Sequence, residues 1–183
     1  MPSLLLRVVF CLVFALSGVA RADTIGVRSA ELRVEEGEVL LNADFDFAVN
    51  ATLEEALQKG IPLYFLLEFE LTRSRWYWLD EKVAQSVITW RVSYNALTQQ
   101  YVARSGLLTQ TFNSLDEVER YIGRVTSRPV AQAAALAKGT RYEAALRLRL
   151  DVNQLPKPFQ VNALASREWT LSSDWYRWSY MLP

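Results

Sequence analysis

The chain has 183 residues, with 20 lysines and arginines against 20 aspartates and glutamates, no histidine and a single cysteine. That cysteine, Cys11, lies within the first 22 residues, so the rest of the chain contains neither a thiol nor an imidazole. Catalytic systems that pair serine or cysteine with histidine are therefore excluded, and so are metal and haem sites built on those ligands. The seven glycines never form the spacing of a phosphate-binding loop.

Residues 1–22 carry the parts of a cleavable secretory signal peptide in their usual order. One basic residue, Arg7, precedes an uninterrupted apolar run, and small residues follow it. Only 13 uncharged residues separate Arg7 from Arg21, whereas a helix that spans a membrane needs about 20. The sequence therefore predicts export, removal of this segment and no membrane span afterwards. The predicted cleavage site consists of Ala20, Ala22 and Asp23.

The mature chain, residues 23–183, is predicted to be a single β-sandwich domain without a disulfide. The signal peptide carries two arginines and no acid, which leaves 18 basic and 20 acidic residues in the mature chain. This balance gives no electrostatic reason to expect nucleic acid or an anionic membrane as a partner. We expect no cofactor, and a core whose apolar bulk includes several of the six tryptophans.

Apolar and polar residues alternate in eight segments, which is the pattern of antiparallel strands with one buried face. In chain order the predicted strands are Ile25–Val34, Val39–Asn50, Leu63–Leu71, Val87–Tyr94, Gln100–Arg104, Leu107–Phe112, Tyr142–Val152 and Trp175–Leu182. About eight strands without a βαβ rhythm predict a mainly β fold, specifically an immunoglobulin- or fibronectin-like antiparallel β-sandwich.

Two short helices are predicted to cap this sandwich. Thr52–Glu55 reads as a capping box that opens the first helix, and Gly60 ends it. Ser114–Glu117 is a second capping box, followed by an apolar stripe at helical spacing. The stripe comprises Leu115, Val118, Tyr121, Ile122 and Val125. The stretch from Pro129 to Lys138 is predicted to be an irregular connection.

A local pattern before the clearest strand is typical of the tyrosine corner of immunoglobulin-like sandwiches. Gly139 forms a turn, and Tyr142 opens the strand two residues after Thr140. In a tyrosine corner the hydroxyl forms a hydrogen bond with the backbone a few residues upstream. We therefore expect such a bond from Tyr142.

Two pairs of carboxylates leave an enzymatic reading open. Asp44 and Asp46 share one strand face, as do Glu68 and Glu70, so each pair lies about 7 Å apart, which is two strand steps. Glycosidases space their two carboxyl groups by about 5–9.5 Å. A carboxylate-based hydrolase or a calcium site is therefore an alternative, although solvated strand faces look the same and no calcium-binding loop is present.

Two clusters of aromatic and basic residues are the candidate binding surface. Tryptophan, tyrosine and arginine are the residue types that most often anchor protein interfaces. They also fill hydrophobic cores, so part of each cluster is expected to be buried. The candidate residues are Arg73, Arg75, Trp76, Tyr77, Trp78, Trp169, Trp175 and Arg177.

The sequence resembles the exported proteobacterial proteins of the domain of unknown function 4390 family. The matching segments are 39–49, 75–78, 139–142, 155–164 and 169–178. The resemblance implies an exported envelope protein, located in the periplasm, with no established activity and no catalytic residues to carry over. Family members are often encoded near a sensor kinase, which implies a link to envelope signalling.

Together these features predict an exported, periplasmic, non-enzymatic interaction domain whose partner is another envelope protein. A carbohydrate-binding domain that recognises peptidoglycan or another glycan is the first alternative. It would require exposed tryptophans in a groove. The carboxylate-based hydrolase is the second alternative, and it would require its acids to converge in a pocket.

Overall fold

The structure is a computed structural model that describes residues 25–73 and 81–182. This part of the chain forms nine β-strands and three α-helices. The strands are β1 (Gly26–Glu35), β2 (Glu38–Asp46), β3 (Leu63–Arg73), β4 (Glu81–Asn95), β5 (Gln100–Ser105), β6 (Leu108–Phe112), β7 (Arg124–Gln132), β8 (Arg141–Leu150) and β9 (Tyr176–Met181). The helices are α2 (Ala51–Gln58), α3 (Leu115–Gly123) and α4 (Lys157–Ala165). The predicted signal peptide and its cleavage site lie outside the described residues.

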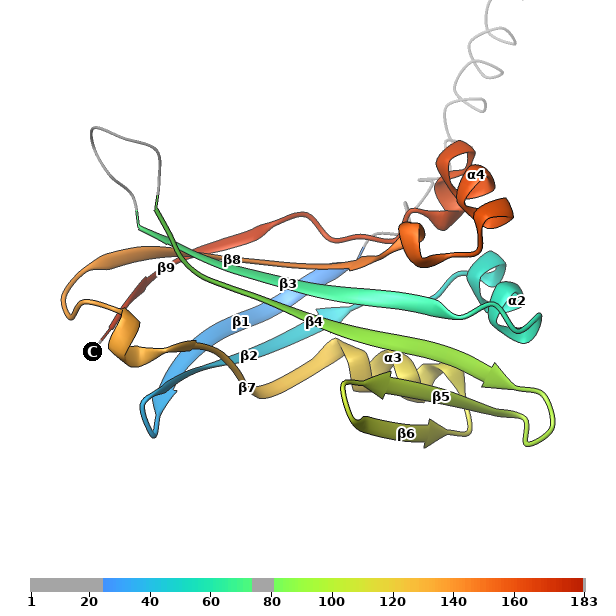
Figure 1. Ribbon diagram of the computed structural model, residues 1–183, viewed down its shortest axis with the longest axis horizontal. Coiled ribbons are helices and arrows are strands. Elements are labelled where there is room, and N and C mark those ends of the chain that lie inside the picture. Colours follow the sequence, from blue (N-terminus) through green and yellow to red (C-terminus); the bar gives the residue numbers. More distant parts are fainter. Residues whose placement is uncertain (1–24, 74–80, 183) are drawn as a thin grey trace, which may run out of the picture.

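The strands form two antiparallel sheets that share one hydrophobic core (Figure 1). The small sheet has the order β1-β2-β7, and the large sheet has the order β6-β5-β4-β3-β8-β9. The prediction of a mainly β, sandwich-like fold is confirmed. Four strands lie at sheet edges, namely β1 and β7 in the small sheet and β6 and β9 in the large one.

The alternation in the sequence determines which faces are buried. Both sheets turn their apolar faces toward each other and their polar faces outward, as period-two patterns require. The inward residues of β3 are at most 1% exposed: Leu63, Phe65, Leu67, Phe69 and Leu71. Those of β2 are Val39, Leu41, Ala43 and Phe45. Each large side chain in this set stabilises the fold by about 1.5–3 kcal/mol.

The N-cap of helix α2 lies two residues before the predicted one. Asn50, not Thr52, is the N-cap, and its side-chain oxygen accepts a 3.0 Å hydrogen bond from the Leu53 amide. Asparagine caps a helix at least as well as threonine, and the Asn50 amide also donates to the Glu168 carbonyl at 2.7 Å. The Thr52 hydroxyl instead contacts the Glu168 carboxylate at 3.1 Å. The helix ends just before Gly60, the predicted stop, where φ is +83°.

Helix α3 begins as predicted but ends earlier than its apolar stripe. The Ser114 hydroxyl accepts a 3.3 Å hydrogen bond from the Glu117 amide, which confirms the predicted cap. The helix stops at Gly123, so Val125 belongs to β7 and not to the helix. A Cβ atom on Gly123 would lie 3.0 Å from the Phe45 carbonyl oxygen. The helix end therefore packs on β2 at a distance that only glycine permits without adjustment.

The sequence prediction is wrong at β7. It places no strand in this part of the chain and predicts an irregular connection from Pro129 onward. The strand pairs with β2 and continues to Gln132, where a short 3₁₀ turn follows. Proline cannot donate a ladder hydrogen bond, so it is confined to edge strands and bulges. Pro129 meets both conditions, because β7 is an edge strand and its register against β2 shifts at Leu40.

Helix α4 is a third helix, where the sequence predicts only two. Its start is obscured by Pro156 and Pro158, which read as turn residues in the sequence. Proline is tolerated in the first helical turn because those amide groups have no partner within the helix. Val161 on this helix is 68% exposed. No α-helix among the described residues is long and apolar enough to cross a membrane.

The expected tyrosine-corner hydrogen bond is present. The Tyr142 hydroxyl accepts a 2.8 Å hydrogen bond from the Ala137 amide. Tyr142 itself is 2% exposed and pairs directly with Tyr180 of β9. The bond therefore fixes the loop that enters β8 against the core.

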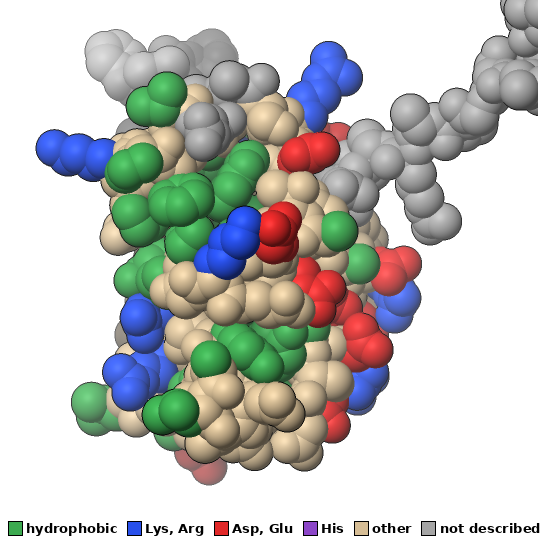
Figure 2. All heavy atoms as spheres, turned by 90° about the vertical axis from the view of Figure 1, so that its right-hand side faces the viewer, with side chains coloured by type: hydrophobic (Ala, Val, Ile, Leu, Met, Phe, Trp, Pro, Cys, Tyr) green, Lys and Arg blue, Asp and Glu red, His purple; other side chains and the backbone are tan. Residues whose placement is uncertain are grey.

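The charged side chains are not distributed evenly over the surface. On the face shown in Figure 2, acidic side chains gather along one side with some basic ones among them, and the opposite side carries basic side chains next to hydrophobic ones. The stretch from Lys82 to Leu115, which contains β5, β6 and all of β4 except its first residue, Glu81, has no aspartate or glutamate. The balanced net charge of the chain thus conceals regions of opposite sign.

Candidate interaction surface

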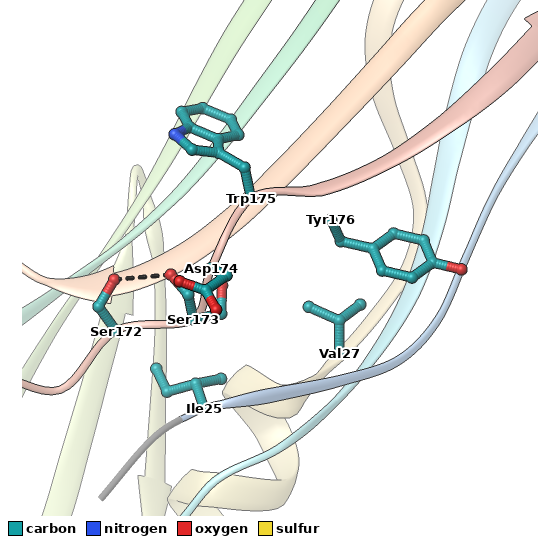
Figure 3. Close-up of a pocket in the computed structure, with 7 residues that line it drawn as sticks. All are labelled: Ile25, Val27, Ser172, Ser173, Asp174, Trp175 and Tyr176. Atoms are coloured by element: carbon teal, nitrogen blue, oxygen red, sulfur yellow. Dashed lines mark hydrogen bonds between the residues drawn. The ribbon is translucent and has the colours of Figure 1, made fainter. Parts of the chain in front are cut away.

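A groove opens between the two sheets where β1 and β9 lie at their edges (Figure 3). Its volume is about 300 Å³. The lining residues are Ile25, Val27, Ser172, Ser173, Asp174, Trp175 and Tyr176. The groove combines apolar side chains from the start of β1 with aromatic, acidic and hydroxyl groups from the segment that leads into β9.

The wall formed by this segment is held in place by hydrogen bonds to β8. The Ser173 amide donates to the Leu148 carbonyl at 2.9 Å, and the Ser173 hydroxyl accepts from the Leu148 amide at 3.1 Å. The Ile25 amide donates to the Ser172 carbonyl at 3.4 Å, which links the two walls. Ser173 is 5% exposed. These hydrogen bonds therefore fix the backbone of this wall relative to β8.

Trp175 is half-buried at the edge of the groove, its ring points away from Ile25 and Val27 (Figure 3), and two arginines accompany the ring. The Arg147 guanidinium lies 4.6 Å from the ring centroid, and that of Arg177 lies 6.0 Å away. Arg177 also forms a 2.8 Å ion pair with Glu143. Cation–π contacts of this kind contribute about 0.5–1 kcal/mol at exposed sites. They hold the indole in one orientation.

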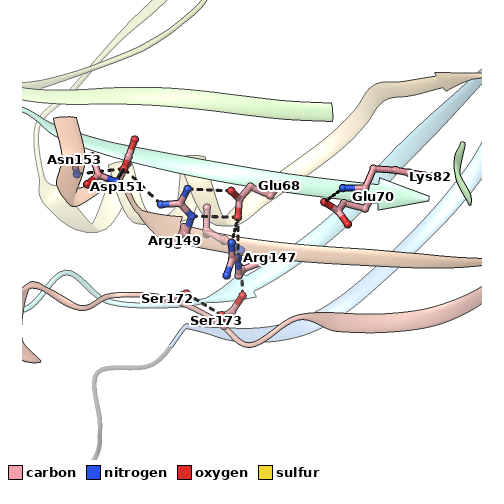
Figure 4. Close-up of polar contacts among 10 residues, drawn as sticks. Glu68, Glu70, Lys82, Arg147, Arg149, Asp151, Asn153, Ser172 and Ser173 are labelled. Carbon is pink, nitrogen blue, oxygen red and sulfur yellow. Dashed lines mark hydrogen bonds and ion pairs between the residues drawn. The ribbon is translucent and has the colours of Figure 1, made fainter. Parts of the chain in front are cut away.

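Arg147 belongs to an ion network on the outer face of the large sheet (Figure 4). Glu68 accepts hydrogen bonds from Nε of Arg147 at 2.8 Å and from Nε of Arg149 at 3.1 Å. Arg149 also lies 3.5 Å from the Asp151 carboxylate. Burial of Glu68 opposes its ionisation, but the hydrogen bonds from Arg149 and Arg147 outweigh this and hold the pKa of Glu68 below its ordinary value. The network thus fixes the arginine on which Trp175 rests.

The two carboxylate pairs predicted from the sequence lie apart from each other. Asp46 lies 2.8 Å from Arg28 on the small sheet, and Asp44 lies 3.8 Å from the same arginine. Glu70 pairs with a lysine at 2.8 Å, while Glu68 serves the arginine network. The two pairs occupy the outer faces of different sheets, which point in opposite directions. Within the described residues no three histidines, cysteines, aspartates or glutamates are grouped so that they could hold a metal ion.

A family model for a domain of unknown function (DUF4390) matches residues 22–179. The chain belongs to the DUF4390 family. The match covers nearly the whole chain and confirms the resemblance found in the sequence. No curated protein and no solved structure matches this DUF4390 chain.

The predicted surface residues of this DUF4390 domain separate into four groups. Trp175 and Arg177 lie together beside the groove, as described above. Trp169 is 7% exposed and packs against Phe159 at 6.1 Å between ring centroids, so it belongs to the core and not to the surface. Arg73 forms an ion pair with Glu81 at the end of β3. Arg75, Trp76, Tyr77 and Trp78 lie outside the described residues.

Sequence reasoning missed Arg147 and Arg149 of this surface in the DUF4390 domain, and it considered Glu68 only as one of a pair of carboxylates. Alternation puts the two arginines on the polar face of one predicted strand and Glu68 on the polar face of another, but alternation alone does not link them. The link is the register of β3 against β8, in which Glu68 lies directly opposite Arg147. The sequence shows only that one strand has an acid on its polar face and the other has arginines on its polar face. Their contact can be predicted only after the pairing and register of the two strands are known.

Proposed function

We propose that this protein is an exported, periplasmic, non-enzymatic interaction domain that binds another envelope protein at the groove between β1 and β9. The observation that carries the proposal is the position of Trp175 at the edge of the groove, where Arg147 holds its indole on the adjoining outer face of the large sheet. Tryptophan and arginine are enriched among the residues that dominate binding energies. Family membership and the predicted signal peptide support the location in the envelope.

The groove suits a segment of a protein partner for two reasons. Its walls lie where the edge strands β1 and β9 begin, and the outer backbone groups of edge strands are available for strand addition. Its aromatic rim is already ordered, so less side-chain freedom is lost when a partner binds. A partner strand would pair with β1 or β9 and pack a side chain between Val27 and Tyr176.

A crosslinking pull-down from the native envelope tests the proposal, using the mature chain, Trp175→Ala and Leu97→Ala. Leu97 is 96% exposed in the turn between β4 and β5, so it serves as a control for loss of an exposed apolar side chain. We expect a protein partner, such as a sensor's outer domain, to be recovered with wild type and Leu97→Ala and lost with folded Trp175→Ala. Equal recovery with all three proteins would contradict the proposed site.

A carbohydrate-binding function is the second candidate, because the groove places Trp175 and Tyr176 next to Asp174 and two serine hydroxyls. Among the four described tryptophans, however, two are buried and two are half-buried. Recovery of cell-wall glycan without protein in the same pull-down would favour this candidate. The hydrolase alternative predicts that Asp44→Asn combined with Asp46→Asn abolishes the cellular function, whereas an interaction domain would tolerate the change.

We also propose that the sandwich is immunoglobulin-like, which the Tyr142 corner supports. Constant-type immunoglobulin domains divide seven strands into sheets of four and three. Here the division is six and three. The proposed relationship therefore rests on the corner and not on the strand order.

A further inference from the structure

The edge strand β6 differs from the other three edge strands. Edge strands in natural proteins carry charges or prolines that prevent other chains from pairing with them. β1 and β9 contain charged residues, and β7 contains both arginines and a proline. The sequence of β6 is LTQTF, without a charge or a proline, and its first four residues are exposed. This edge is therefore open to an additional strand.

A second cleft lies beside this edge, between β6 and β7, with a volume of about 320 Å³. Its apolar and aromatic lining comes from Trp90, Leu108, Tyr121, Val125 and Pro129. Its polar lining comes from Gln110, Arg124, Thr126, Ser127 and Arg128. No acid belongs to this set, and no ion pair among the described residues involves either arginine.

A bulge in β7 directs one of these arginines toward the cleft. The register against β2 shifts by one residue between Arg128, which lies opposite Leu41, and Val125, which lies opposite Ala43. Side chains of directly opposed residues share a face, so Arg128 lies on the face that Leu41 turns to the core. Ser127 within the bulge has a φ of +47°. Bulges commonly re-aim a side chain in this way.

We propose that the cleft between β6 and β7 binds an extended acidic segment of a partner protein, which adds to the large sheet along β6. The segment's backbone would use the open edge of β6, and its carboxylates would pair with Arg128 and, at the rim of the cleft where it lies opposite Asp44, with Arg124. A small anion would pair with the arginines but could not form backbone hydrogen bonds with the edge of β6. A neutral peptide could pair with β6 but would form no ion pair with the arginines. The surrounding acid-free region from Lys82 to Leu115 favours the same ligand.

This inference rests on the proposed function only in that the ligand is a protein segment. It names a second surface, because the cleft lies between β6 and β7 whereas the proposed groove lies between β1 and β9. The two surfaces can therefore be tested separately. The acidic peptide should bind Trp175→Ala as tightly as it binds wild type, whatever the pull-down with that variant shows.

Fluorescence anisotropy with a labelled eight-residue peptide of alternating valine and glutamate tests the inference on the mature chain. We expect binding to weaken at least about tenfold with Arg124→Gln combined with Arg128→Gln. Arg141→Gln is the matched control, because Arg141 is also exposed on a strand and without an ion pair among the described residues, and it should change affinity less than about twofold. Arg128→Lys keeps the positive charge and should retain part of the affinity. This result would show that the loss in the double variant comes from the missing charge and not from a folding defect.

Three further probes separate strand addition from simple charge attraction. The peptide methylated on alternate backbone nitrogens should lose binding, because it cannot pair with β6. The peptide with glutamine in place of glutamate should bind at least about tenfold more weakly. Inorganic phosphate should compete only weakly. Equal binding of the methylated peptide, equal competition by phosphate, or dimerisation of the chain through this edge would overturn the inference.

Discussion

The two open sides of the sandwich have the same construction and opposite chemistry. On each side an edge strand of the small sheet faces an edge strand of the large sheet, with a groove of about 300 Å³ between β1 and β9 and of about 320 Å³ between β6 and β7. The first groove contains Asp174 and no base, and the second contains Arg124 and Arg128 and no acid. A chain with balanced net charge can therefore present two surfaces that select different partners.

The two sides also use their tryptophans differently. Trp90 forms part of the cleft between β6 and β7 but is 3% exposed, so it belongs mainly to the core. Trp175 is half-buried and rests on an arginine at the surface. The difference indicates that the first groove has a surface tryptophan at its edge, held by an arginine, whereas the tryptophan of the second belongs to the core below it.

The largest expected effect compares these tryptophans. Trp90→Ala should lower the free energy of unfolding by about 3–5 kcal/mol, because it leaves a cavity in the core. Trp175→Ala should lower it by less than about 1 kcal/mol, since only a cation–π contact and partial burial are lost. Urea unfolding of both variants measures the difference. A similar loss for both would mean that Trp175 is a core residue and that the comparison between the two sides is wrong.

Removal of Glu68 should have the next largest effect. Its side chain is 18% exposed and lies between two arginines. Glu68→Ala leaves Arg147 and Arg149 partly buried without this acceptor, which should cost about 2 kcal/mol. Glu70→Ala is the control, because Glu70 forms a single, more exposed ion pair with Lys82 and should cost less than about 1 kcal/mol.

The same glutamate predicts a dependence of stability on pH. Hydrogen bonds from Arg149 and Arg147 overcome the effect of burial and lower the pKa of Glu68 in the folded state. Its stabilising contribution is therefore complete above the unfolded-state pKa of about 4.3 and is lost as the pH falls through the lower folded-state value. Urea unfolding between pH 7 and pH 3 should show a smaller decline for Glu68→Gln than for wild type. An equal decline would assign the acid sensitivity to other carboxylates.

The sequence predicted buried and exposed faces well because alternation is a local property. The inward residues of β3, such as Phe65 and Leu67, needed only period two for their assignment. Strand β7 was missed because Pro129 argues against a strand, and its tolerance there depends on an edge position that the sequence does not display. Trp169 and Trp175 look alike in the sequence, and only tertiary packing makes one core and the other surface.

The sequence predicted which types of residue form the candidate site, but not which of them come into contact. Glu68 and Arg147 are 79 residues apart, and their contact depends on the register of β3 against β8. The two grooves depend on which strands become sheet edges, which is a property of the topology. The opposite charges of the two sides follow from that topology, and the net charge of the chain gave no indication of them.

A pair of glycines, one from each side, gives a smaller expected effect. Gly123→Ala should lower the free energy of unfolding by about 1 kcal/mol, because the new Cβ would lie 3.0 Å from the Phe45 carbonyl oxygen, which β2 holds in place. Gly26→Ala at the start of β1 meets nothing closer than 3.6 Å and should change stability by less than about 0.5 kcal/mol. Thermal unfolding of both variants measures the contrast. No loss in Gly123→Ala would show that α3 can move away from β2.

The smallest expected effect compares two tyrosines that lie opposite each other on β8 and β9, the large-sheet strands of the side that carries Trp175. Tyr142→Phe removes the acceptor for the Ala137 amide and should lower the free energy of unfolding by about 1 kcal/mol. The Tyr180 hydroxyl is buried without a hydrogen-bond partner among the described residues, and burial raises its pKa. Tyr180→Phe removes a polar group that folding takes out of water, so stability should stay the same or rise slightly. Urea unfolding of the two variants tests this, and a loss for Tyr180→Phe as large as that for Tyr142→Phe would mean that the Tyr180 hydroxyl is satisfied by bound water at the β9 edge.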